Sequence, residues 1–240
     1  MGLSAAVRGR LAELSSRYGL AEGTASRFEA LLVGLACEPD PHTTDSTPKR
    51  AVDAHIADSL TALELPSVRS ARSIVDVGAG AGFPGLALAV ALPDATVHLL
   101  ESRGRKCAVI ERLANASGTE AVVVCARVEE FAAGDGPRHD LVTARAVASL
   151  AVLVEYAAPL LAEGGCLVAW KGARDKTEET QGSAAAQEVG LRPQAVRAVK
   201  PFAAAHSRHL HVYEKDAATP ARFPRRPGMA AKRPLGRGCV

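Results

Sequence analysis

Three glycines occupy alternate positions in the stretch VDVGAGAGFPG, at Gly78, Gly80 and Gly82. A short β-branched run precedes them, and an apolar run with helical spacing follows. Glycine has no Cβ, so such a turn can bend sharply and let a ligand approach the backbone closely. In a parallel sheet, ligands bind outside the carboxyl ends of the strands. The pattern therefore predicts a small-molecule site here, and a tight turn without a ligand is the simpler alternative.

Two classes of ligand fit this turn. Gly80, Gly82 and Gly85 satisfy the G-x-G-x-x-G pattern of dinucleotide-binding proteins, which leaves an NAD-dependent oxidoreductase open. The glycines at 78, 80 and 82, with Asp76 two residues before them, instead resemble the first motif of Rossmann-like S-adenosylmethionine-dependent methyltransferases. That resemblance implies that the turn holds the zwitterionic amino-acid end of the cofactor and that Asp76 helps to order it.

Further polar residues follow the next predicted strands. Glu101 ends the second strand, where an acid can accept both ribose hydroxyls of an adenosine in either cofactor class. Val128 and Glu129 lie in a predicted loop after the third strand, where the backbone and the carboxylate could meet an adenine ring. Arg145 follows the fourth strand and could contact the cofactor, a phosphate or the substrate base. A salt bridge with Glu129 or Glu130 is the alternative for Arg145.

The elements that position these residues alternate between strand and helix. Strands are predicted at 73–78, 96–102, 120–126, 139–146, 166–172, 194–200 and 208–215. A helix is predicted from residue 149 and is stopped by Gly164 and Gly165. This alternation indicates an α/β protein with a mostly parallel seven-stranded sheet, helices on both faces and an antiparallel finish. Residues 1–72 read as a helical extension packed on the core, 73–216 as the cofactor-binding domain and 217–240 as a basic, proline-rich tail.

Composition bounds the class of protein. Hydrophobic residues make up 48% and charged residues 23% of the chain, the balance of an ordinary soluble globular protein. No apolar run reaches the roughly 20 residues of a membrane span, and the amphipathic N-terminus lacks a signal-peptide pattern. The five cysteines include no C-x-x-C pair, which argues against a disulfide framework or a zinc site. We therefore expect a cytoplasmic protein without a membrane or metal role.

Several motifs occur together in one order: HIADSL, DVGAGAGFPGLAL, ESRGRK, RVEEF, TARAVASL, WKG and FPRRPGMAAKRPL. With this order and spacing the chain resembles the ribosomal RNA small subunit methyltransferase G family, also called glucose-inhibited division protein B. The resemblance runs from about residue 55 to residue 235. It implies a Rossmann-like class I methyltransferase that uses S-adenosylmethionine to methylate guanine N7 in 16S ribosomal RNA. The implied cofactor contacts are Gly78, Phe83, Val128, Glu129 and Arg145, and Gly80 and Glu101 complete the predicted cofactor site.

An RNA substrate is polyanionic, so basic residues should surround the site. The tail has no acidic residue after 216, and its basic residues are Arg222, Arg225, Arg226, Lys232, Arg233 and Arg237. Four more lie at the ends of predicted strands: Arg103, Arg105 and Lys106 follow the second strand, and Lys171 is at the end of the fifth. Prolines should keep the tail extended along an RNA backbone, where such contacts position the RNA and do not read its sequence. A disordered, merely solubilising tail is the alternative.

The chemistry of guanine N7 shapes the expected mechanism. N7 carries a lone pair and no proton, so it can attack a sulfonium methyl without a general base, and catalysis reduces mainly to positioning. We therefore expect no catalytic residue that transfers a proton. His55 and Asp58, one helical turn apart, either touch the substrate or lock the N-terminal helices to the core. A non-catalytic RNA-binding assembly factor remains a further alternative. We expect a monomer that binds 16S ribosomal RNA in the small subunit and does not bind DNA.

Overall fold

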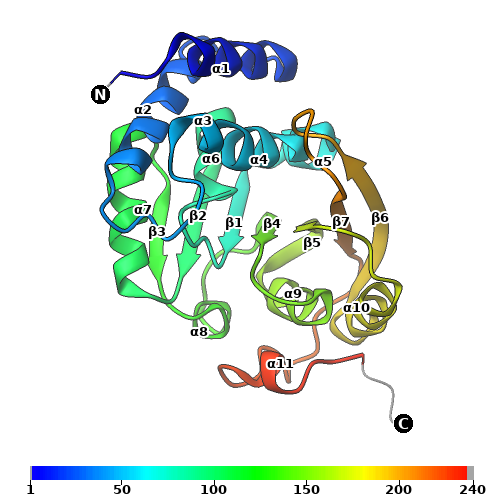
Figure 1. Ribbon diagram of the computed structural model, residues 1–240. Helices are drawn as coiled ribbons and strands as arrows, with labels where there is room; N and C mark the ends of the chain where they lie inside the picture. Colours follow the sequence, from blue (N-terminus) through cyan, green and yellow to red (C-terminus); the bar gives the residue numbers. More distant parts are fainter. Residues whose placement is uncertain (1, 237–240) are drawn as a thin grey trace.

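The computed structural model, which describes residues 2–236, is built around one seven-stranded sheet (Figure 1). Its strands are β1 (Ser73–Val77), β2 (Thr96–Glu101), β3 (Val122–Cys125), β4 (His139–Arg145), β5 (Leu161–Lys171), β6 (Leu191–Val199) and β7 (Arg208–Lys215). They lie in the order β3-β2-β1-β4-β5-β7-β6. Strands β1 to β5 pair in parallel, whereas β7 runs antiparallel to both β5 and β6. The predicted α/β fold, with its antiparallel finish, is confirmed.

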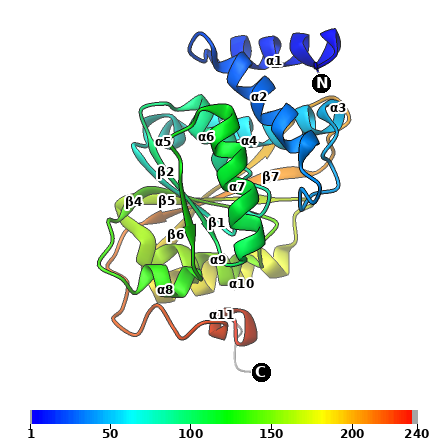
Figure 2. The same ribbon diagram turned by 90° about the vertical axis from the view of Figure 1, so that its left-hand side faces the viewer.

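Side chains of the central strands alternate between two apolar layers. Ile74 and Leu99 face a core shared with the N-terminal helices, while Val75 and Leu100 face a second core on the other side of the sheet. Helices α6 (Gly85–Ala91) and α7 (Gly104–Ser117) belong to the first layer (Figure 2). Helices α8 (Val128–Ala132), α9 (Leu150–Ala157) and α10 (Lys176–Val189) belong to the second. Burial on both faces explains why the strands read as continuous β-branched runs.

The N-terminal segment is helical up to the first strand. It contains α1 (Ala5–Tyr18), α2 (Thr24–Cys37), α3 (Pro48–Ala51), α4 (Asp58–Leu60) and α5 (Pro66–Ser70). A π-helical turn (Val52–Ala57) joins α3 to α4, and a 3₁₀ turn (Thr61–Glu64) follows α4. Such π-helical turns are rare and occur often at functional sites. This one carries His55 and immediately precedes Asp58.

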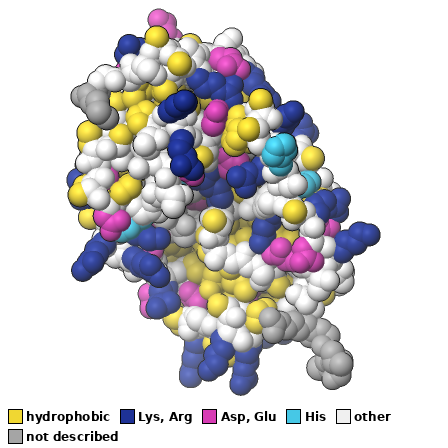
Figure 3. All heavy atoms as spheres, in the orientation of Figure 1, with side chains coloured by type: hydrophobic (Ala, Val, Ile, Leu, Met, Phe, Trp, Pro, Cys, Tyr) yellow, Lys and Arg dark blue, Asp and Glu magenta, His cyan; other side chains and the backbone are white. Residues whose placement is uncertain are grey.

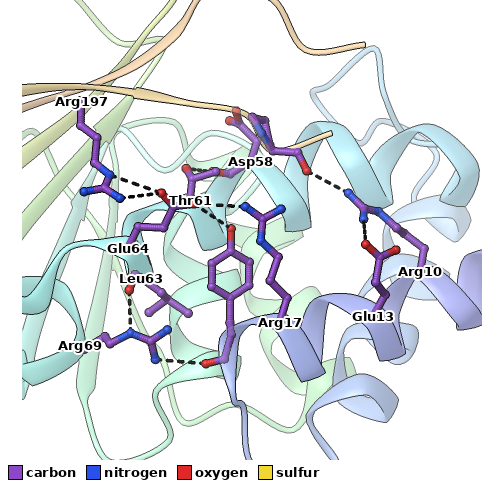
Figure 4. Close-up of polar contacts among 11 residues, drawn as sticks. Arg10, Glu13, Arg17, Asp58, Thr61, Leu63, Glu64, Arg69 and Arg197 are labelled. Atoms are coloured by element: carbon purple, nitrogen blue, oxygen red, sulfur yellow. Dashed lines mark hydrogen bonds and ion pairs between the residues drawn. The ribbon is translucent and has the colours of Figure 1, made fainter. Parts of the chain in front are cut away.

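Polar contacts around Glu64 tie α1 to the far edge of the sheet (Figure 4). The Glu64 carboxylate accepts hydrogen bonds from Arg17 of α1 at 3.4 Å and from Arg197 of β6 at 3.1 Å. Arg69 donates to the carbonyl oxygens of Leu63 at 2.7 Å and Tyr18 at 3.1 Å. Exposed ion pairs contribute little stability, so the buried apolar side chains of α1 supply most of the stabilisation at this contact.

The boundary between α9 and β5 differs from the prediction. The helix ends at Ala157 and a 3₁₀ turn follows, and β5 already begins at Leu161. Gly164 and Gly165 therefore lie inside the strand and do not stop the helix. A Cβ on Gly165 would lie 2.9 Å from the His139 carbonyl oxygen, so only glycine allows this close approach of β5 to β4. The apolar run after Pro159 reads equally well as helix or strand, which explains the wrong prediction.

The tail folds back onto the second face of the sheet. It contains a one-turn helix, α11 (Met229–Lys232), beside α9, although its prolines were expected to keep it extended. Phe223 is buried among the side chains of the second core, and the Arg225 guanidinium forms a two-pronged ion pair with Glu155 of α9. The tail is thus packed through these residues and is not simply extended. Arg237 lies outside the described residues.

Candidate functional site

The glycine turn joins the end of β1 to α6, and hydrogen bonds hold it against the end of β2. The amide groups of Gly78 and Ala79 donate to the Leu100 carbonyl oxygen at 2.8 and 3.1 Å. Gly78 has φ +68°, and a Cβ there would lie 2.7 Å from Cγ2 of Val147. The turn therefore requires glycine at this position, because a side chain would be strained and would fill the space above the turn.

Asp76 orders this turn from below. Its Oδ2 accepts from the Gly85 amide at 2.9 Å, and its Oδ1 accepts from the Thr143 hydroxyl at 2.8 Å. Complete burial raises the pKa of Asp76 to about 6, against the opposing effect of these hydrogen bonds. Both carboxylate oxygens face protein groups, so Asp76 fixes the start of α6 and lines neither of the cavities beside the turn.

Two cavities flank the turn, and Gly78 lines both. The smaller, of about 150 Å³, is lined by residues that include Glu101, Val128, Glu129, Val147 and Tyr156. The larger, of about 380 Å³, is lined by residues that include His55, Asp58, Gly80, Phe83, Lys106, Arg145 and Arg208. The structure thus gathers the predicted cofactor residues along one continuous edge, at the carboxyl ends of β1, β2 and β4.

Glu101 and Glu129, which line the smaller cavity, both accept hydrogen bonds from backbone amides. Glu101 accepts from the amides of Gly80 at 3.1 Å and Arg103 at 2.9 Å, and each oxygen keeps capacity for a second donor. Val128 and Glu129 were predicted to lie in a loop, but they begin helix α8 instead. Glu129 Oε1 accepts from the amide of Gly228 in the tail at 2.7 Å. The tail therefore adjoins the smaller cavity.

Arg145 joins the sheet to the π-helical turn. Its Nη1 donates to Asp58 Oδ2 at 2.8 Å and to the Ala54 carbonyl oxygen at 2.9 Å. The proposed salt bridge with Glu129 or Glu130 is therefore wrong, because the partner of Arg145 is Asp58. The Asp58 carbonyl oxygen also accepts from Trp170 Nε1 at 3.0 Å. These contacts hold the N-terminal helices against the core and place His55 and Asp58 in the larger cavity.

His55 is held as a neutral ring. Its Nδ1 lies 3.0 Å from Arg145 Nη2, which can only donate, so Nδ1 accepts and Nε2 carries the proton. Nε2 then donates to the Thr43 hydroxyl at 3.1 Å. Burial, reinforced by the Arg145 charge, lowers the pKa of His55 to about 4. Both ring nitrogens are engaged, so the ring is a structural link and not a free base.

The predicted basic residues occupy different environments. Arg103, Arg105 and the tail residues Arg222, Arg226, Lys232 and Arg233 are exposed. Figure 3 shows Lys and Arg side chains gathered at the lower end of the molecule, where Figure 1 places the tail. Lys106 lines the larger cavity, whereas Lys171 donates to Glu178 and the Ala148 carbonyl oxygen. Arg225 is occupied by Glu155 and by the Arg233 carbonyl oxygen.

Sequence reasoning missed Arg208, which lines the larger cavity. Because β7 runs antiparallel to β5, its first residue lies at the edge where the parallel strands end. The predicted antiparallel finish was therefore a signal that could have placed Arg208 beside the site. The loop before α3 also contributes to the cavity through His42, Thr43 and Asp45, and its irregular sequence gave no such signal.

Within residues 2–236 no group of His, Cys, Asp or Glu side chains is arranged to hold a metal ion. Within the same range no helix combines the length and the apolar character needed to cross a membrane.

Comparison with known proteins places the chain in a family. Residues 42–210 match the GidB family model, described as rRNA small subunit methyltransferase G. The ribosomal RNA small subunit methyltransferase G of Rubrobacter xylanophilus is 40% identical over 80% of this chain and 76% of its own length. The protein of the same name from Pelotomaculum thermopropionicum is 38% identical over 75% of this chain and 77% of its own length.

Among solved structures, Aeropyrum pernix fibrillarin with natively bound S-adenosylmethionine matches with TM-score 0.53 and 15% identity. That match covers 65% of this chain and 72% of the fibrillarin chain, and it shows the Rossmann-like class I methyltransferase fold. The cofactor of such enzymes is S-adenosylmethionine. The sequence match extends over most of the chain and includes both the glycine turn and Arg145, so this protein belongs to the ribosomal RNA small subunit methyltransferase G family.

Proposed function

We propose that this chain transfers a methyl group from S-adenosylmethionine to N7 of a guanine in 16S ribosomal RNA, without a general base. Family membership supports the reaction class and the RNA substrate. The observation that carries the base-free mechanism is the state of His55. Its lowered pKa, near 4, and its two engaged nitrogens leave it unable to accept a proton in the larger cavity. Guanine N7 requires no such acceptor.

The residues present fit S-adenosylmethionine. Gly78 lines both cavities without a Cβ, so a ligand can approach its backbone closely, and an oxygen of the buried Asp58 carboxylate lacks a hydrogen-bond donor among residues 2–236. When bound, the cofactor supplies an electrophilic methyl group on its sulfonium. We assign the amino-acid end to the larger cavity and the adenosine to the smaller one. The residues assigned to the cofactor are Gly78, Gly80, Phe83, Glu101, Val128, Glu129 and Arg145.

Each assigned residue binds or orients. Glu101 has free acceptor capacity for ribose hydroxyls while its backbone-amide contacts hold the carboxylate in place. Val128 and Glu129 border the adenine position, and Glu129 also holds the tail through Gly228. Arg145 and Phe83 border the amino-acid end. Since the chemistry is a direct displacement, placing N7 in line with the methyl group at about 3 to 3.5 Å is the main contribution of the protein.

Single-turnover methylation tests this proposal. Undermethylated small subunits should accept a labelled methyl group, and mapping of the product should place it on guanine N7. The rate of the chemical step should lack a steep acidic limb arising from a protein base, because no base takes part. A steep limb assigned to a protein group would contradict the mechanism. Binding of NAD in place of S-adenosylhomocysteine, or the absence of methyl transfer, would contradict the activity itself.

We assign RNA contact to basic residues near the site and in the tail. They are Arg103, Arg105, Lys106, Lys171, Arg222, Arg225, Arg226, Lys232 and Arg233. Lys171 and Arg225 are already paired with Glu178 and Glu155, so their contribution requires those pairs to share or exchange partners. We further propose that the protein acts as a monomer, in the cytoplasm.

The salt dependence of RNA binding tests the assignment. Replacing Arg103 and Arg105 by Gln should weaken binding and make the slope of log K against log salt concentration shallower by about 0.7 for each lost phosphate contact. Arg8→Gln is the matched control, because Arg8 is exposed on α1, at the opposite end of the molecule from the tail (Figure 1). An unchanged slope in the double variant would remove these two residues from the interface.

A further inference from the structure

Asp58 has a buried carboxylate in which only one of the two oxygens accepts a hydrogen bond from the described part of the chain. Its side chain is only 7% exposed. Oδ2 accepts from Arg145 at 2.8 Å, whereas Oδ1 has no hydrogen-bond donor among the described residues. Arg208 Nε lies 3.8 Å from Oδ1, beyond hydrogen-bond distance. Leaving a buried charged oxygen without a donor is unfavourable, so a donor from outside the protein is expected there.

Arg145, the partner of Asp58, also has N–H groups without an acceptor among the described residues. Arg145 Nη1 serves Asp58 and the Ala54 carbonyl oxygen, and Nη2 serves His55. Its Nε has no acceptor within residues 2–236. Asp58 and Arg145 both line the larger cavity, together with Gly78 and Gly80, so a carboxylate oxygen without a donor and guanidinium N–H groups without an acceptor in this range belong to residues of the same cavity. A ligand group that carries an ammonium and a carboxylate on one carbon matches this pair of opposite charges.

We propose that Asp58 Oδ1 binds the α-ammonium group of the methionine end of the cofactor, with Arg145 facing the α-carboxylate. This assignment rests on the proposed function, since it takes S-adenosylmethionine as the ligand of the cavity. Asp76, the acid nearest to the glycine turn in sequence, cannot fill this role because it is buried, lines neither cavity and holds the Gly85 amide and the Thr143 hydroxyl. Asp58, contributed by the N-terminal helices, supplies the acid that the cofactor meets.

Charged groups of both signs line the cavity, as the binding of a zwitterion requires. Arg145, Arg208 and Lys106 line it together with Asp58 and Asp45, and Asp45 is paired with Arg50 at 2.7 Å. An ammonium at Oδ1 gains a charge-assisted hydrogen bond to a desolvated carboxylate. A carboxylate on the same carbon faces the cationic side. The ligand group thus adds no net charge to a largely buried site.

Calorimetric titration with two ligands tests the proposal without RNA or turnover. One ligand is S-adenosylhomocysteine, and the other is its deamino analogue, in which hydrogen replaces the α-ammonium group. The full-length wild-type protein should bind the deamino analogue about tenfold more weakly or worse, the change expected for a lost hydrogen bond to a charged group. Equal affinities for the two ligands would overturn the proposal, and this arm requires no variant.

Asp58→Asn extends the test. The amide oxygen can still accept from Arg145, but an amide nitrogen then replaces Oδ1 and cannot accept from an ammonium. We expect the affinity for S-adenosylhomocysteine to fall about tenfold, the affinity for the deamino analogue to change less than about twofold, and the preference between them to disappear. Asp53→Asn is the matched control, since it removes the same charge from the same helical segment outside the cavity, and it should keep the preference.

The outcomes separate the two proposals. Failure of wild-type protein to bind S-adenosylhomocysteine would overturn the proposed function and this assignment with it. Binding in which Asp58→Asn weakens both ligands equally would overturn only the assignment, and would leave Asp58 as a structural support of Arg145. An Asp58→Asn variant with unchanged affinities but lost methyl transfer would place the oxygen against the RNA and would also overturn the assignment.

Discussion

The ring of His55 lies flat against the ring of Phe83, with centroids 4.6 Å apart and planes 8° from parallel. His55 belongs to the π-helical turn, and Phe83 belongs to the glycine turn between β1 and α6. The stack therefore joins the N-terminal helices to the loop that borders both cavities. Phe83 is 4% exposed, so most of its ring contacts protein and one edge reaches the larger cavity.

Replacing Phe83 by Ala should lower the free energy of unfolding by about 3 kcal/mol, because a buried aromatic ring leaves a cavity behind. The affinity for S-adenosylhomocysteine should fall as well, since the glycine turn loses its contact with His55. Urea denaturation and calorimetry measure the two effects. Phe83→Tyr keeps the ring and should retain most of the stability, unless the added hydroxyl finds no space. An alanine variant as stable as the wild type would contradict the proposed importance of this stack.

Acidification should destabilise the protein through buried histidines. Burial lowers the pKa of both His55 and His139 to about 4, so between pH 6.5 and 4 the unfolded chain binds more protons. Their contribution to stability is complete above pH 6.5 and is lost as the pH falls through 4. Asp76 acts in the opposite direction, because its folded pKa is raised to about 6 and its contribution is lost as the pH rises through that value. One histidine is thus offset, and the second leaves a loss of about 1.4 kcal/mol per pH unit between pH 6 and 4.5, to which His98 and His211 add because burial lowers their pKa as well.

Urea denaturation at several pH values checks this balance. His139→Gln removes one of these histidines, so the loss of free energy of unfolding over that range should become shallower by about 1.4 kcal/mol per pH unit. His206→Gln, which changes an exposed histidine, should keep the wild-type dependence. If His139→Gln lost stability on acidification as steeply as the wild type, another group would have to bind the proton.

The basic residues of the tail should have two different roles: Arg225 anchors the tail to the core, and Arg226 faces the RNA. Arg225 neutralises Glu155, whose side chain is only 3% exposed, so Arg225→Ala should cost about 3 kcal/mol by leaving a buried charge unpaired. Arg226→Ala changes an exposed residue next to it and should reduce RNA affinity with little change in stability. Thermal unfolding and RNA titration of the two variants make the comparison. Equal stability of the two variants would contradict an anchoring role for Arg225.

Local sequence patterns predicted much of this structure, but they did not predict its long-range pairings. The strand, the glycine turn and the following helix could be predicted at 73–91, because turn chemistry and burial act within a few residues. The partner of Arg145 could not be predicted, since Asp58 lies 87 residues away and nothing local marks it. The contact between Glu129 and Gly228 spans 99 residues and has the same character. The edge that holds the site was therefore predictable, whereas the groups that complete it depend on how the N-terminal helices and the tail dock.

Two glycines of the turn should respond differently to alanine. A Cβ on Gly85 would lie 2.1 Å from Leu99 Cδ2 and 2.9 Å from Asp76 Cβ, so α6 would have to move away from the sheet. Gly85→Ala should therefore lower the free energy of unfolding by about 2 kcal/mol, as overpacking does. A Cβ on Gly78 would instead meet Val147, which is 37% exposed and can move, and the left-handed backbone adds a strain of about 1 kcal/mol.

Ligand binding then distinguishes a cofactor site from a purely structural turn. In Gly78→Ala the new methyl group and the displaced Val147 occupy the space above the turn, so the affinity for S-adenosylhomocysteine should fall more than tenfold while the protein stays largely folded. In Gly85→Ala the fraction that remains folded should bind with nearly the wild-type affinity, because Gly85 lines neither cavity. Calorimetry on the folded fraction of each variant measures the contrast. If both variants lost affinity only in proportion to stability, Gly78 would shape the fold and not the ligand site.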